Sequence, residues 1–304
     1  MHIPSIDQVK RQAALPSSAP ICPKSSITAA LNARGSLFLG AVDGQLFFEQ
    51  EFEYKSIQAH ESLIRALEHD GQFRLFSGSD DSAIKMWDIR GDQPQLQRVF
   101  GSLPGVRSYH RQLTLLHGAR TLASSRGQFD HYHIRLWDLA SFQNTRTAQG
   151  HEGYIRSMLV DAGGRIVSAS EDRYLKVWDA RTCALLHAYF HSGKILFLFA
   201  HAPTRSYCIV DDKNRLLLLD QDLLTPYHAV HLGKKVTNAA AASFLYLHLD
   251  RYLCVYSWGL ELEERIDLGA VWTSTSMIEM GTVLTVSDVH GNLHELHPAV
   301  LAKN

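Results

Sequence analysis

The sequence predicts an all-β protein in which one small antiparallel sheet is repeated around a shared axis. The first observation is internal repetition: residues 60–88 and 151–179 align without a gap, and their first residues lie 91 positions apart. That spacing corresponds to two units of about 45 residues, a period typical of folds built from repeated supersecondary units. The second observation is that apolar residues alternate in short runs between Gly-bearing turns, as half-buried strands require.

The aligned copies share a His at the start, a Ser and an Asp in the middle, and Trp-Asp at the end. The matched pairs are His60 with His151, Ser77 with Ser168, Asp81 with Asp172, and Trp87 with Trp178. A third unit between them keeps Ser124 and Trp137, which are 13 positions apart, whereas Ser77 and Trp87 are 10 apart. This third unit has a longer turn and no clear His at its start.

These residues closely resemble WD repeats, whose signature is a His near the start of each unit and Trp-Asp near its end. The resemblance covers roughly residues 59–190, and the remainder matches only in rhythm. It implies a β-propeller of four-stranded blades in which Asp, His, Ser and Trp form a chain of hydrogen bonds within a blade. A buried indole N–H, hydroxyl and imidazole each need a partner. The resemblance therefore gives a structural role, not a catalytic one, to His60, Ser77, Asp81, Trp87, Ser124, Trp137, His151, Ser168, Asp172 and Trp178.

The whole chain, residues 1–304, is interpreted as one seven-bladed β-propeller. The expected blades are 21–58, 59–100, 101–149, 150–190, 191–231, 232–268 and 269–300, with Tyr256 near the Trp position of the sixth. The last unit offers only three strands, so we expect the N-terminal segment 1–20 to supply its outer strand and close the ring without an open edge. Six or eight blades are the alternatives, because the last three units lack the signature.

Composition argues against several classes of partner. The 304 residues carry 30 Lys+Arg and 31 Asp+Glu, a formal net charge of −1, so no bulk charge favours nucleic acid or a membrane surface. The four cysteines are far apart, which favours a reducing, intracellular compartment, cytoplasmic or nuclear. The N-terminus has no apolar run of signal-peptide length, and the apolar runs elsewhere are too short to span a bilayer. A bacterial protein injected into a host cell would share these features.

No motif for catalysis is present. The sequence contains no nucleophile elbow, P-loop, paired-His zinc helix or dinucleotide fingerprint. His290, His294 and His297 have spacings that suit a metal on a helix, but their context predicts a strand. The sequence thus predicts a protein that is not an enzyme and that needs no cofactor and no metal. The alternatives are a divergent propeller enzyme with its site at the central channel, or a binder of small ligands or glycans.

The resemblance also implies where a partner docks. In WD-repeat proteins the narrower face is the usual docking surface, and two positions per blade point at the partner: the residue after the first apolar residue of the inner strand, and the residue before the turn Asp. The first position falls on Thr28, Arg65, Arg156, Thr237 and Trp272, and the second on Asp80 and Glu171. The longer entry to the third blade adds Arg107, Tyr109, His110 and Arg111 to this rim.

The expected partner is a protein or peptide with an acidic or phosphorylated segment. Arg and Trp dominate the energetics of protein interfaces, and Arg holds a carboxylate or phosphate in bidentate fashion. We therefore expect a non-catalytic scaffold or adaptor, monomeric as a propeller within a larger complex. The alternative for Arg65 and Arg156 is that they pair with Asp80 and Glu171 or lie in water.

Overall fold

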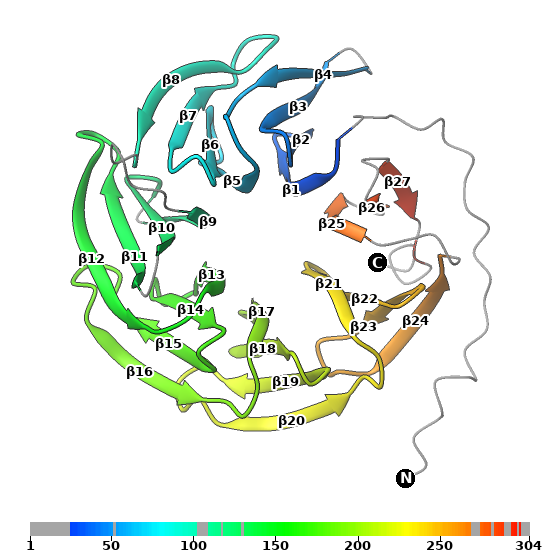
Figure 1. Ribbon diagram of the computed structural model, residues 1–304. Helices are drawn as coiled ribbons and strands as arrows, with labels where there is room; N and C mark the ends of the chain where they lie inside the picture. Colours follow the sequence, from blue (N-terminus) through cyan, green and yellow to red (C-terminus); the bar gives the residue numbers. More distant parts are fainter. Residues whose placement is uncertain are drawn as a thin grey trace.

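A computed structural model describes residues 25–50, 53–101, 109–116, 118–128, 131–268, 274–280, 283–288, 293–296 and 298. All the regular secondary structure within these ranges consists of β-strands, numbered β1 to β27. The strands group into six four-stranded antiparallel sheets and one three-stranded sheet, and Figure 1 shows these sheets arranged around a common centre. The architecture is a β-propeller.

Each blade follows the chain in order from its inner to its outer strand. The first blade contains β1 (Ile27–Ala33), β2 (Ser36–Ala41), β3 (Gln45–Gln50) and β4 (Glu53–Gln58). The second contains β5 (Ile64–His69), β6 (Arg74–Ser79), β7 (Ile84–Asp88) and β8 (Gln95–Phe100). The third contains β9 (Tyr109–Leu116), β10 (Thr121–Gln128), β11 (His131–Asp138) and β12 (Gln143–His151).

The second half of the chain repeats this order. The fourth blade contains β13 (Ile155–Val160), β14 (Ile166–Ser170), β15 (Tyr174–Trp178) and β16 (Leu185–Phe190). The fifth contains β17 (Ile195–His201), β18 (Ser206–Asp211), β19 (Arg215–Asp220) and β20 (Pro226–His231). The sixth contains β21 (Val236–Ala241), β22 (Leu245–Leu249), β23 (Tyr252–Tyr256) and β24 (Leu262–Asp267). The three-stranded sheet contains β25 (Ser274–Met280), β26 (Val283–Asp288) and β27 (Leu293–Leu296).

The prediction of seven four-stranded blades is wrong, because the structure has six. The last sheet pairs only β25, β26 and β27 within the part of the chain that the structure describes. Its β25 lies beside β1 and β21, so it occupies the place between the sixth blade and the first (Figure 1). The segment 1–20, which we expected to supply a fourth strand, lies outside the described residues. The alternation of apolar residues indicates strands, but it does not say which strands pair.

The hydrophobic core lies between neighbouring blades. Trp87 packs against Phe38 and Phe48 of the first blade, and Trp178 packs beside Leu136 and Ala148 of the third. The second strand of each complete blade is buried almost throughout, as in β14, whose five residues are all buried. Burial of apolar surface is the main favourable term in folding, so stacking of blade on blade stabilises the ring.

A chain of hydrogen bonds runs through the fourth blade. Trp178 Nε1 donates to Ser168 Oγ at 2.8 Å, and Ser168 Oγ lies 2.7 Å from His151 Nε2. His151 Nδ1 lies 2.7 Å from Asp172 Oδ2. This geometry is that of a neutral imidazole, which donates from Nδ1 to the carboxylate and accepts the serine proton at Nε2. Burial lowers the pKa of His151, which agrees with the neutral form.

The second blade repeats this chain. Trp87 Nε1 donates to Ser77 Oγ at 2.9 Å, and His60 bridges Ser77 Oγ at 2.7 Å and Asp81 Oδ2 at 2.8 Å. Burial alone would raise the pKa of Asp81, but the hydrogen bond from His60, with those from the N–H groups of Ala83 and Glu61, lowers it to about 2. The carboxylate is therefore ionised and fixes the imidazole tautomer.

The other blades keep part of this chain or none of it. In the third, Trp137 Nε1 still donates to Ser124 Oγ at 2.9 Å. In the fifth, the strand register puts Ile209 and Leu219 where the second blade has Ser77 and Trp87. Exchanging both polar partners for apolar side chains leaves no orphaned donor, so it costs little. The sixth blade has Tyr256, paired with Leu245, at the register position of the Trp.

Replacing Trp178 by Phe tests this interpretation. The variant loses the indole donor and part of a fully buried ring, so we expect the free energy of unfolding to fall by about 1–3 kcal/mol. Urea denaturation followed by circular dichroism measures this change. The matched control is Trp258→Phe, because Trp258 is only half-buried and its Nε1 makes a long 3.3 Å bond to the Ala242 carbonyl. Equal losses in the two variants would contradict a structural role for the buried chain.

Candidate functional site

Each of the seven described inner strands has a β-bulge near its start, one residue after the first in six of them and two residues after the first in β9. The pairing register shifts there in β1, β5, β9, β13, β17, β21 and β25 and leaves one residue unpaired in each. The unpaired residues are Thr28, Arg65, Arg111, Arg156, Leu196, Thr237 and Thr275. A bulge frees one residue from the ladder and changes the direction of its side chain.

Five of these bulged residues line one cavity. Its volume is about 240 Å³, and its lining is Thr28, Arg65, Arg111, Gln112, Arg156, Leu196 and Phe197. We call it the arginine cavity. Its walls come from the inner strands of five consecutive blades, β1, β5, β9, β13 and β17, which surround the centre of the ring in Figure 1. Bulges at one register position thus bring together residues from distant parts of the sequence.

Arg65 is paired with a neighbouring carboxylate. Its Nε donates to Asp80 Oδ1 at 2.8 Å and its Nη2 donates to Oδ2 at 2.6 Å. This is the fork geometry that suits a planar guanidinium and a carboxylate. The side chains are 30% and 14% exposed, so the pair fixes Arg65 at the wall of the cavity while leaving it accessible to a ligand.

Arg156 is held less firmly. Its Nη1 lies 3.4 Å from Glu171 Oε1, and Lys194 Nζ lies 3.4 Å from Oε2 of the same carboxylate. One carboxylate is therefore shared between two cations. Solvent-exposed ion pairs of this length contribute little, typically below about 1 kcal/mol, so Arg156 can exchange its partner for a ligand at low cost.

Arg111 lies between the other two arginines and has no carboxylate partner among the described residues. Its guanidinium stacks over the Tyr154 ring, 4.6 Å from the centroid, and its buried Nε has no hydrogen-bond partner. Burial, and then the charges of Arg65 and Arg156, lower the pKa of Arg111. The cavity and its edge thus hold four cations, Arg65, Arg111, Arg156 and Lys194, against the two carboxylates of Asp80 and Glu171.

His110 precedes Arg111 but points away from this cavity into the interior. It takes the register position of Ile64 in the second blade and is fully buried. Gly101, at φ +83°, lies so close that a Cβ there would sit 3.1 Å from the imidazole Nε2. Burial first, and the charge of Arg126 next, lower the pKa of His110 to about 4. A histidine has thus replaced an apolar core residue and remains neutral at pH 7.

The remaining rim residues of the sequence analysis fall in different places. Tyr109 begins β9 and does not line the cavity, and Thr237 hydrogen-bonds the carbonyl of His248 at 3.2 Å. Arg107 and Trp272 lie outside the described residues. In the three-stranded sheet the register places Thr275 at the bulge, three positions beyond Trp272.

Sequence reasoning missed three residues of the lining, Gln112, Leu196 and Phe197. Leu196 directly follows Ile195, the first apolar residue of β17, just as Arg65 follows Ile64 in β5. The rule that found Arg65 would therefore also have found Leu196. No sequence pattern identifies Gln112 or Phe197. Each of them directly follows a bulged residue and also lines the cavity.

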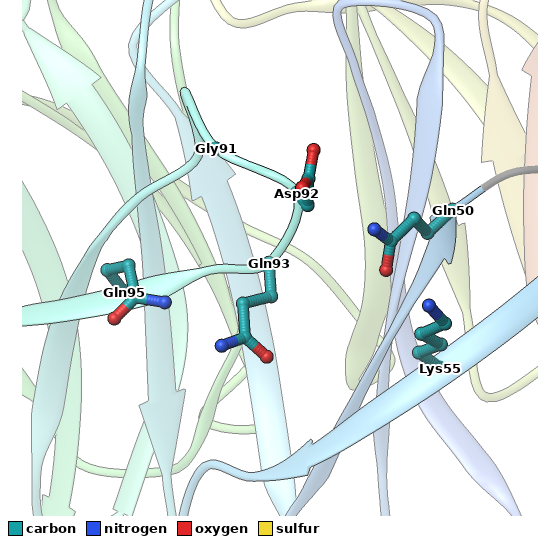
Figure 2. A pocket seen from close by; sticks show the side chains of 6 residues that line it. All are labelled: Gln50, Lys55, Gly91, Asp92, Gln93 and Gln95. Carbon is teal, nitrogen blue, oxygen red and sulfur yellow. The ribbon is translucent and has the colours of Figure 1, made fainter.

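A second cavity, shown in Figure 2, lies between the first and second blades. It is lined by Gln50 and Lys55 on one side and by Gly91, Asp92, Gln93 and Gln95 on the other. One cation and one carboxylate face each other among neutral amides, so this cavity has no unbalanced charge. We do not take it as the functional site.

The described residues offer neither a metal site nor a membrane-spanning helix. They contain no group of three or more His, Cys, Asp or Glu side chains placed to hold a metal ion. None of them forms a helix of the length and apolar character needed to cross a membrane.

Comparison with models of protein families identifies the repeat in this chain. The model of the WD domain, G-beta repeat, matches residues 52–88 and 142–179. The predicted resemblance to WD repeats is confirmed at these two sites. The two matched segments end at Asp88 and Asp179, directly after the two indoles that complete the four-residue hydrogen-bond chains.

Curated WD-repeat relatives resemble parts of the chain. It is similar to nuclear distribution protein PAC1 of Arthroderma otae, 32% identical over 144 residues that cover 41% of this chain and 31% of the relative. It is similar to Coronin-7 of Mus musculus, 26% identical, covering 47% of this chain and 16% of the relative. It is also similar to pre-mRNA-splicing factor cwf17 of Schizosaccharomyces pombe, 27% identical, covering 40% and 34%. The chain thus spans about a third or less of the length of these relatives.

Replacing Arg111 by Met distinguishes a binding role from a structural one. Because Arg111 has no ion-pair partner to leave behind, we expect the free energy of unfolding to stay within about 0.5 kcal/mol of the wild type or to rise. The matched control is Arg165→Met, since Arg165 Nε donates at 2.8 Å to the buried Asp161. That variant strands a carboxylate and should lose about 3 kcal/mol in urea denaturation. A comparable loss in Arg111→Met would show that Arg111 is structural.

Acid should destabilise the protein through His110. Its pKa is about 4 in the folded chain and about 6.5 in the unfolded chain, so between these pH values the unfolded chain binds the extra proton. This contribution is fully present above pH ~6.5 and is lost as pH falls towards 4, for a total of about 3 kcal/mol. Thermal melts at several pH values measure the slope. His110→Ile, which restores the residue type found at this position in the second blade, should flatten it, and an unchanged slope would contradict the assignment.

Proposed function

We propose that this WD-repeat protein is a non-catalytic interaction scaffold, and that its arginine cavity docks a partner segment with an acidic or phosphorylated side chain. The observation that carries the proposal is the convergence of three guanidinium groups from three consecutive blades on one cavity with two carboxylates. We also propose an intracellular location, as the names of the nuclear distribution and pre-mRNA-splicing relatives suggest.

The charge of the cavity favours a dianion over a single carboxylate. Arg65 pairs with Asp80, and Arg156 and Lys194 share Glu171. With Arg111, four cations stand against two carboxylates, which leaves a surplus of two positive charges. A phosphorylated Ser or Thr carries about −1.5 to −2 charges at pH 7 and three acceptor oxygens. It can accept from the guanidinium groups of Arg111 and Arg156, which line the cavity, while the Arg65–Asp80 pair stays intact.

The cavity is also rigid, which lowers the entropic cost of binding. Gln112 Nε2 donates to the Arg156 carbonyl at 3.1 Å, and Ser157 Oγ donates to the Leu198 carbonyl at 3.2 Å. Thr28 Oγ1 donates to the Ile64 carbonyl. Each bond joins the inner strands of two neighbouring blades, so the guanidinium groups are held in place before a ligand arrives.

An apolar wall gives the cavity a second kind of contact. Leu196 and Phe197, at the start of β17, face the same space as the three arginines. A ligand that is only an anion would leave this wall unused. A peptide with an apolar residue beside its negative side chain would contact both, which favours a protein partner over a small anion.

Oriented peptide libraries test the proposal. Nonapeptides with a fixed central phosphoserine, Asp, Ser or Lys and degenerate flanks are titrated against the labelled protein by fluorescence anisotropy. We expect the phosphoserine and Asp libraries to bind, phosphoserine more tightly, and the Ser and Lys libraries not to bind. The double charge reversal Arg65→Glu with Arg156→Glu should weaken binding at least ten-fold.

The matched control is Arg120→Glu with Arg181→Glu, which reverses two exposed arginines outside the cavity. It changes the net charge by the same amount, so a general electrostatic effect would weaken binding equally in both variants. Equal binding of the Ser and phosphoserine libraries, or equal affinity of the two double variants, would refute the proposed site.

A further inference from the structure

A larger groove separates the second and third blades on the outer side of the ring. Its volume is about 530 Å³, and its lining residues come from the end of β8, from β11 and from the β11–β12 turn. We call it the interblade groove. It shares no lining residue with the arginine cavity. The arginine cavity is lined from inner strands, whereas β8, β11 and β12 lie farther from the centre of the ring (Figure 1).

Aromatic rings form the floor of the groove. Phe100 packs edge-on against Trp137, with ring centroids 5.6 Å apart. Its ring is tilted against that of Phe142, with centroids 5.5 Å apart. Phe100 and Trp137 are buried, while Val99 at the rim is 50% exposed. Surface of this kind is stable when an apolar side chain of a partner covers it.

The charge along the groove is of one sign. Arg98 and Arg135 line it, and no Asp or Glu does. The Arg98 guanidinium lies over the Phe142 ring, 5.5 Å from its centroid, and is otherwise exposed. The Nε of Arg135 is buried and has no hydrogen-bond partner, and burial lowers the pKa of Arg135.

The residues equivalent to Arg135 in the second and fourth blades each have a hydrogen-bond partner, whereas Arg135 Nε has none among the described residues. The register aligns Arg135 with Lys85 of the second blade and Lys176 of the fourth, because each pairs with the Ser that accepts from the Trp. Lys85 Nζ donates to the Ala59 carbonyl at 2.6 Å, and Lys176 Nζ donates to the Gly150 carbonyl. A buried donor without a partner costs about 1–3 kcal/mol, more when it is charged. The third blade therefore carries a cation whose Nε has no hydrogen-bond partner among the described residues, and whose guanidinium lines the groove.

We infer that the interblade groove docks an extended segment of a partner protein in which an acidic side chain neighbours a large apolar one. The carboxylate accepts from Arg135 and Arg98, and the apolar side chain lies on Phe142 and Val99. Charge complementarity selects the acidic residue, and the aromatic floor selects its neighbour. This site goes beyond the proposed function, which concerns the arginine cavity alone.

The test uses a display library of random dodecapeptides panned on the Arg65→Glu, Arg156→Glu variant, whose arginine cavity is disabled. Enriched peptides are synthesised and titrated into the same variant labelled with ¹⁵N-tryptophan. We expect an Asp or Glu beside an aromatic or large aliphatic residue, and a chemical-shift change at the Trp137 indole N–H. The indole of Trp258, which is outside the groove, should not shift.

Two further variants locate the contact. Arg98→Glu, an exposed change that leaves folding intact, and Arg135→Gln should each weaken binding at least ten-fold, and Arg120→Glu on the same blade should have no effect. Absence of any enriched peptide, or enriched peptides that bind Arg98→Glu as well as Arg120→Glu, would overturn the inference. Because the arginine cavity is disabled throughout, failure here leaves the proposed function untouched, and success does not depend on it.

Discussion

The packing of each blade against its neighbour is the constraint on which the rest of the structure depends. A sheet of four short strands cannot bury both of its faces alone, so its apolar residues must meet those of the adjacent blade. In the second and fourth blades the largest of these residues is a Trp, whose buried indole N–H cannot donate to solvent water. Ser, His and Asp supply a continuous series of partners for it. The position of the whole blade is thereby fixed by hydrogen bonds as well as by shape.

The bulges separate residues that stabilise the ring from residues that are free to bind. A residue before the bulge is buried, as Ile64 and Ile155 are, and a residue after it rejoins the ladder. The bulged residue itself has no ladder partner, so its side chain can change without loss of the core. Across the blades this one position is Thr, Arg or Leu. Substitution at this position therefore costs little folding stability, and the inner strands hold these side chains at fixed points around the centre of the ring.

The sequence predicts the role of a residue when that role depends on neighbours within the same blade. The hydrogen-bond chain of Asp81, His60, Ser77 and Trp87 rests on spacings within one blade, and those spacings are visible in the sequence. The equivalent bulge residue of the third blade could not be aligned, because three extra residues in the β10–β11 hairpin and the absence of a starting His remove both reference points. Strand pairing identifies it as Arg111.

The prediction of the number of blades was wrong for a related reason. Period-2 alternation predicts that a segment such as 283–288 is a strand, and it is. It carries no information on whether a fourth strand joins the sheet, since that depends on a partner distant in sequence. The interblade groove could not be predicted from the sequence for the same reason. Arg98 and Arg135 line it from two different blades, and neither residue belongs to a local sequence pattern.

The third blade shows how a structural network can give way to binding chemistry. In the second blade Asp81 lies four residues after Ser77, whereas the residue four positions after Ser124 is Gln128, and residues 102–108 contain no His to match His60. The Trp137–Ser124 bond remains, but the His and Asp of the chain are absent. His110, Arg111 and Arg135 occupy the positions at which the second and fourth blades have Ile, Arg and a Lys that donates to a backbone carbonyl. Such local departures from the repeat lower stability and gather at functional sites. At each of its two cavities the third blade places a guanidinium group whose Nε has no hydrogen-bond partner among the described residues, Arg111 at one and Arg135 at the other, and closing the ring does not require either of them.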